Sequence, residues 1–159
     1  MLLPIDKNTM KKYLVLLILF TNAKILSAQI AISYFPFQSI FSVATNTEKH
    51  FFLDSKVETN GFISNLNMEF SPKFNFIRKE SVNYYAGTGL SINPANLFAN
   101  LPITNGYFVD LGVRAKPWKT VHQFQVVFEI SPYVNTEFRS GNLRTRLGIG
   151  WNFEKRKRV

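Results

Sequence analysis

The chain has no cysteine, only two histidines and no long apolar run beyond its N-terminal region. The absence of cysteine excludes disulfide bonds, thiolate metal sites, cysteine nucleophiles and a lipidated N-terminal cysteine. His50 and His122 lie at unrelated positions and cannot supply the usual three or four ligands of a metal site. The sequence also has no Gly-rich phosphate loop, no serine nucleophile elbow and no DNA-reading motif. We therefore expect no metal, no cofactor and no nucleic-acid partner.

Aromatic residues are abundant, although the mean hydropathy is close to zero. They make up 15% of the 159 residues, and 16 of them are phenylalanine. Such a composition is typical of many short alternating strands. The formal charge of +9 gathers near the two ends, in Lys7, Lys11, Lys12, Lys24 and residues 155–158, so the body of the chain is close to balance.

The N-terminal region has the three-part layout of a secretory signal. Lys11 and Lys12 precede an apolar run over residues 13–20, and Ser27-Ala28-Gln29 ends a more polar exit. The run is too short to cross a bilayer as a helix, which takes about 20 residues. We expect a signal peptide over residues 1–28, with Met10 as an alternative start and cleavage after Ala28.

Almost everything after residue 36 alternates with period two, which predicts strands rather than helices. Turn signals such as Asn60-Gly61 and Ser140-Gly141-Asn142 separate the runs. Ser71-Pro72 suggests a bulge or a sheet edge. The predicted strands are residues 37–46, 50–59, 62–77, 81–92, 106–116, 121–138 and 142–153. A closed bacterial barrel needs an even number, so we expect an eighth strand within residues 29–35.

The last predicted strand shows the alternation best. Leu147, Ile149 and Trp151 share one face with Phe153, and Arg144 and Arg146 lie on the other. A soluble barrel would turn the apolar face inward, whereas a transmembrane barrel turns it toward lipid. The second arrangement predicts a lumen filled by paired charges: Asp54, Lys56, Glu58, Glu69, Asp110, Arg114, Lys116, Glu129, Arg144 and Arg146.

The segment 146–153 resembles the C-terminal β-signal of outer-membrane proteins, through Arg146, Gly148, Trp151 and Phe153. Segments 83–89, 111–114 and 128–133 look like strands of the same broad family, the small outer-membrane β-barrel proteins of Gram-negative bacteria. Most members end at the final aromatic residue, whereas here the basic tail 154–159 follows. The resemblance implies a single antiparallel up-and-down transmembrane barrel over residues 29–153, placed in the outer membrane by the barrel-assembly machinery. It implies no particular activity.

Our first hypothesis is a non-enzymatic outer-membrane barrel with an aromatic girdle formed by Tyr84, Tyr107, Trp118, Trp151 and Phe153. Its longest loop, from Asn93 to Asn105, would face outside and contact a partner through Leu97, Phe98 and Leu101. The second hypothesis is a secreted soluble barrel that binds a small apolar ligand, as lipocalin-type barrels do. The third is a lipid-modifying outer-membrane enzyme, in which His122 would face lipid.

Overall fold

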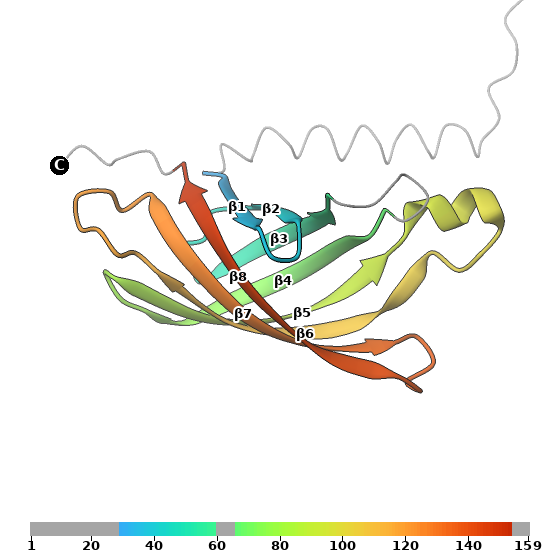
Figure 1. The fold of residues 1–159 in the computed structure, drawn as a ribbon. Coiled ribbons are helices and arrows are strands. Elements are labelled where there is room, and N and C mark those ends of the chain that lie inside the picture. Colours follow the sequence, from blue (N-terminus) through green and yellow to red (C-terminus); the bar gives the residue numbers. More distant parts are fainter. Residues whose placement is uncertain (1–28, 60–65, 154–159) are drawn as a thin grey trace, which may run out of the picture.

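The computed structural model describes residues 29–59 and 66–153, and these form one closed antiparallel β-barrel (Figure 1). Each strand pairs with the next in the chain, and β8 closes the barrel against β1. This confirms the predicted all-β fold of eight strands, including the strand within residues 29–35. The predicted signal peptide and the basic tail lie outside the described residues. The strands are β1 (Ala31–Phe35), β2 (Ile40–Ala44), β3 (Phe51–Glu58), β4 (Met68–Arg78), β5 (Val82–Ile92), β6 (Thr104–Ala115), β7 (Phe124–Asn135) and β8 (Gly141–Asn152).

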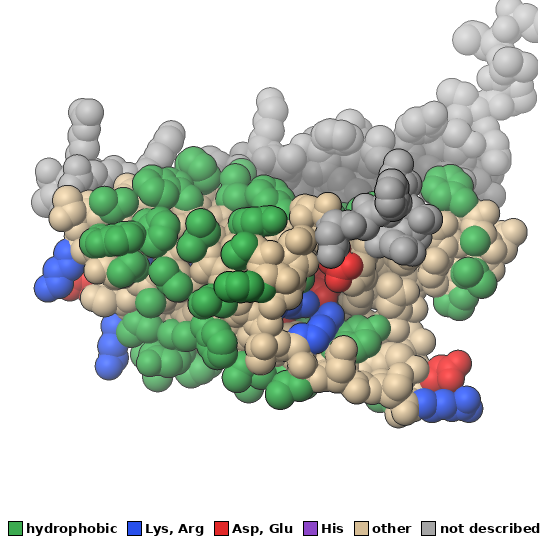
Figure 2. All heavy atoms as spheres, in the orientation of Figure 1, with side chains coloured by type: hydrophobic (Ala, Val, Ile, Leu, Met, Phe, Trp, Pro, Cys, Tyr) green, Lys and Arg blue, Asp and Glu red, His purple; other side chains and the backbone are tan. Residues whose placement is uncertain are grey.

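Burial alternates along the strands, with polar side chains inside and apolar side chains outside. In β8, Arg146 is buried whereas Leu147 and Ile149 are exposed; in β6, Asp110 is buried whereas Leu111 is half exposed. The hydrophobic side chains spread over the outer wall are visible in Figure 2. Because successive strand side chains point to opposite faces, one choice of register fixes this division for a whole strand.

The register sets how the strands tilt. If each residue is followed to its paired residue on the next strand, starting at Trp151 in β8, the path passes through Ile32 and Ser55 and goes once around the barrel. It returns to β8 at Gly141, ten residues before its starting point, and this offset is the stagger of the barrel. A stagger of this size requires strongly tilted strands. An interior of eight strands is just wide enough for side chains to fill it.

The two ends of the barrel differ. We call the end with residues 36–39, 93–103 and 136–140 the loop end, and the end where β1 begins and β8 stops the terminal end. At the loop end, the last or first residue of every strand lies within three residues of this path of paired residues. Because the strands are tilted, the traced path rises by roughly 25 Å over one full circuit of the barrel, given a strand spacing of about 4.8 Å and a tilt of about 40°. The rim of the loop end is therefore lower at β1 than at β8.

Three details differ from the sequence-based expectation. Pro72 lies inside β4 opposite Leu53, and the register shift against β5 falls between Asn75 and Ile77 instead of at Ser71-Pro72. Two predicted strands are shorter in the structure: 37–46 is reduced to β2 (Ile40–Ala44), and 121–138 is reduced to β7 (Phe124–Asn135). The connection from β5 to β6 contains a short 3₁₀ helix, η2 (Pro94–Ala99). None of the helical segments in the described residues has the length and apolar character needed to cross a membrane.

Candidate functional site

The centre of the lumen holds two lysines among three carboxylates. Lys73 Nζ lies 2.7 Å from Asp54, 2.9 Å from Asp110 and 2.6 Å from Glu129. Lys56 Nζ contacts the same three carboxylates, at 3.9 Å from Asp54 and 3.2 Å from Asp110. Lys73 is 1% exposed and Glu129 is 0% exposed, so these ion pairs lie out of water. Burying such charges is costly, and the dense pairing offsets that cost.

Sequence reasoning missed Lys73, although it lies at the middle of this cluster. In β4 it is in phase with Glu69 and Ser71, and all three side chains are buried. The bulge expected at Ser71-Pro72 would have broken this phase. Unbroken alternation from Glu69 would have placed Lys73 in the lumen.

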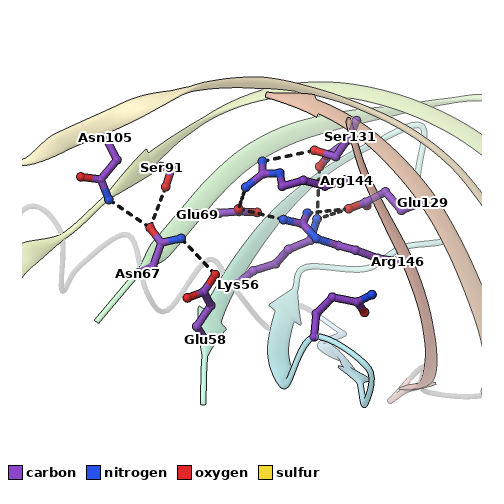
Figure 3. Close-up of polar contacts among 12 residues, drawn as sticks. Lys56, Glu58, Asn67, Glu69, Ser91, Asn105, Glu129, Ser131, Arg144 and Arg146 are labelled. Atoms are coloured by element: carbon purple, nitrogen blue, oxygen red, sulfur yellow. Dashed lines mark hydrogen bonds and ion pairs between the residues drawn. The ribbon is translucent and has the colours of Figure 1, made fainter. Parts of the chain in front are cut away.

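A second tier of charges extends the cluster toward the loop end (Figure 3). Arg146 bridges Glu129 at 3.1 Å and Glu69 at 2.8 Å, and Arg144 binds Glu69 at 2.7 Å. Arg144 also lies over the rings of Tyr133 and Phe108. The connected network contains four carboxylates and four bases: Asp54, Glu69, Asp110, Glu129, Lys56, Lys73, Arg144 and Arg146.

Three of the predicted lumen charges lie outside this network. Glu58 is half-buried near the loop end and accepts a hydrogen bond from Asn67, which Ser91 and Asn105 also contact (Figure 3). Arg114 is buried but forms no ion pair with any described residue. Its guanidinium instead lies about 5 Å from the ring centres of Phe52 and Tyr85, a distance at which cation–π attraction acts. The third, Lys116, belongs to the terminal end.

The turn between β2 and β3 folds into the terminal end. Glu48 accepts hydrogen bonds from Lys116 at 2.6 Å, Gln125 at 3.0 Å and Asn83 at 3.1 Å. The preceding Thr47 is fully buried, and Asn75 donates to its carbonyl. The terminal end is therefore filled by a turn of the chain, a feature that sequence alternation could not reveal because turn residues have no strand phase.

The outer wall carries the predicted girdle residues. Tyr84, Tyr107 and Trp151 are exposed on strands, and Trp118 packs on Phe124 with ring centres 4.8 Å apart. An apolar groove of about 720 Å³ also lies along β2, β3 and β4, lined by residues such as Val43, Leu53, Phe70 and Pro72. Apolar surface is thus available outside the barrel, whereas most of the buried side chains of the described lumen are charged or polar.

The four residues of the resemblance to the β-signal divide between the two faces. Arg146 is buried in the ion network, and Trp151 and Phe153 are exposed. Gly148 faces the lumen, where a Cβ would lie 2.6 Å from Tyr34 O and 2.7 Å from Phe35 Cδ1. Two of the four residues therefore also have a place in the packed interior.

The histidines of the described chain lie apart from the ion network. His50 stacks on Phe74, and His122 is exposed in the connection between β6 and β7. No group of histidines and carboxylates suited to a metal ion occurs among the described residues. Comparisons with protein-family models, curated proteins and solved structures found no match.

We predict that Glu129→Gln destabilises the barrel by about 3–5 kcal/mol, because Lys56, Lys73 and Arg146 would remain buried beside one carboxylate fewer. Urea unfolding of the protein in detergent micelles measures this change. The control is Glu137→Gln, because the Glu137–Arg139 pair is exposed and should contribute no more than about 0.5 kcal/mol. Equal effects of the two substitutions would contradict a structural role for the network.

We predict that Glu48→Ala loosens the turn that fills the terminal end. The donors on Lys116, Asn83 and Gln125 would lose their shared acceptor, at a cost of about 1–3 kcal/mol. Amide hydrogen exchange at residues 46–50 should accelerate, whereas Lys49→Ala, which removes an exposed side chain of the same turn, should leave it unchanged. Unchanged exchange in the Glu48 variant would show that the carboxylate does not hold the turn.

Proposed function

We propose that the protein is an integral outer-membrane barrel, closed to solutes, that serves as a non-enzymatic anchor for its exposed loops. The observation that carries this proposal is the polarity of the wall. Lys73 and Glu129 are buried in the lumen, whereas Leu111 is 50% exposed and Ile149 is 54% exposed on the outside. A protein in water gains stability by burying apolar surface, so this distribution suits a barrel whose surroundings are apolar.

The length of five of the eight strands supports the same proposal. Strands β4 to β8 have 11 or 12 residues, and a tilted transmembrane strand needs about 9–11. Strands β1, β2 and β3 are shorter, with 5, 5 and 8 residues. Most of the wall also pairs its backbone groups between neighbouring strands, as lipid demands, but β1 pairs only with the last residues of β8. The exposed rings of Phe74, Tyr84 and Trp151 are consistent with an aromatic girdle toward the terminal end.

The orientation follows from the ends of the barrel. Long loops of bacterial outer-membrane barrels face outside, and short turns face the periplasm. The connection over residues 93–103 lies at the loop end, whereas residues 79–81 form a short turn at the terminal end. We therefore infer that the loop end faces the medium. The signal-like N-terminus and the resemblance of residues 146–153 to a β-signal fit export and assembly into the outer membrane.

The two alternatives receive less support from the geometry. A soluble barrel of the lipocalin type would need an apolar interior around its ligand, and the described interior is packed with ion pairs. A lipid-modifying enzyme needs a base beside a nucleophile, and no described hydrogen bond joins His50 or His122 to a serine. Closure to solutes follows from the filled lumen and from the turn at the terminal end.

The substitution Leu111→Arg tests the membrane assignment, because Leu111 lies near the middle of β6 and points outward. A charge facing the bilayer midplane should lower the free energy of unfolding by about 2–4 kcal/mol in lipid vesicles. In a soluble barrel the same exposed change should stay within about 0.5 kcal/mol.

The matched control is Thr136→Arg, at an exposed position in the turn after β7. This variant should match the parent protein. The folded parent should also migrate faster on a detergent gel before boiling than after it. A soluble parent without heat-dependent mobility, in which Leu111→Arg is silent, would refute the proposal.

A further inference from the structure

The connection between β5 and β6 presents apolar side chains to its surroundings without burying any of them. Leu97 is 60% exposed, Phe98 is 90% exposed and Leu101 is 56% exposed. No residue of η2 is buried. We call these three residues the η2 patch. An exposed apolar cluster marks an interaction site more often than a scattered single residue does.

Hydrogen bonds, and not packing, fix the shape of this connection. The Asn93 side chain accepts from the Ala95 N–H at 3.0 Å, and Asn96 Nδ2 donates to Pro102 O at 2.8 Å. The Asn93 N–H donates to Ile103 O at 2.8 Å, which ties the two ends of the connection together. Asn100 ends η2 in the left-handed conformation, at a φ of 54°. The patch is thus held in place before it binds, which lowers the entropy cost of binding.

The charge of the segment narrows the chemistry of the partner. The sequence has no Asp, Glu, Lys, Arg or His between Glu80 and Asp110. Helices that bind a lipid surface carry Lys and Arg on their polar face, whereas here the polar residues around the patch are asparagines. An uncharged patch is matched by an uncharged apolar surface, and such a contact should be insensitive to salt.

The position of the η2 patch favours a protein as its binding partner, rather than the lipid that would surround the barrel wall. In Figure 2 the hydrophobic side chains at the η2 end stand apart from the main hydrophobic group on the same face. The rim of the loop end also climbs toward β8, so the β5–β6 connection projects farther than the turn between β1 and β2.

We propose that the η2 patch docks a second protein at the membrane surface, through an apolar and uncharged contact in which the Phe98 ring is the anchor. Aromatic side chains carry a large share of the energy in such contacts. This proposal deepens the proposed function and depends on it, because the loop end must face the medium.

Cysteine labelling tests the proposal, because the natural chain has no cysteine. Ala99→Cys places one thiol beside the patch and leaves the patch intact. Ser140→Cys, in the turn after β7, is the matched control at an exposed position of the same end. A membrane-impermeant maleimide is applied to intact cells that make the protein and to the purified full chain in lipid nanodiscs.

We expect Ala99→Cys to react at least about tenfold more slowly in cells than in nanodiscs, which corresponds to at least about 90% coverage. Ser140→Cys should react equally in both. A high-salt wash should not remove the protection, whereas adding Phe98→Ser to Ala99→Cys should abolish it.

Three results would overturn the proposal. Equal reaction of Ala99→Cys in cells and nanodiscs would show that nothing covers the patch. Slow reaction in nanodiscs would show that lipid covers it. If Ala99→Cys still reacts slowly in cells after Phe98→Ser is added, the covering molecule does not contact the Phe98 ring and is something other than the proposed protein, such as surface glycolipid. These three results can be distinguished from a failure of the proposed function. In that case the purified chain would not enter nanodiscs and would not show heat-dependent mobility on a detergent gel.

Discussion

The ion network around Lys73 and Glu129 is the interaction on which the rest of the barrel depends. An eight-stranded barrel leaves an interior that only side chains can fill, and here those side chains are mostly polar, with charged groups at the centre. Four carboxylates and four bases therefore have to satisfy one another, since breaking one partner leaves a buried charge uncompensated. The alternation of each strand places most of the large apolar residues on the outer wall.

A filled lumen determines where function can lie. The central network blocks the axis, and Glu48 draws a turn into the terminal end, so neither a pore nor an enclosed ligand cavity fits this interior. The outer wall and the loop end remain. The wall offers apolar area suited to acyl chains, and the loop end offers residues that the fold does not need for its own packing, above all Phe98.

Much of this could be predicted from the sequence, because period-two alternation is a direct consequence of strand geometry. It predicts seven of the strands and the inward direction of residues such as Asp54 and Arg146, and the even number of strands in a closed barrel predicts the eighth. It does not predict Lys73, because Ser71-Pro72 suggests a bulge or a sheet edge, whereas the ladder tolerates the proline and shifts near Phe76 instead. Glu48 lies in a turn, and the stacking of Arg114 on Phe52 and Tyr85 depends on neighbours across the lumen that no sequence pattern specifies.

The same register that packs the lumen also shapes the surface that a partner would meet. A stagger of ten residues combined with short β1 and β2 strands leaves the upper half of β8 without a strand neighbour from β1. The Gln38 side chain donates to Thr145 O there, which satisfies one carbonyl of that edge. The rim is therefore low at β1 and β2 and high at the β5–β6 connection. A protein approaching along the membrane normal would meet the η2 patch before the lower turns, so the position of the patch follows from the tilt that closes the barrel.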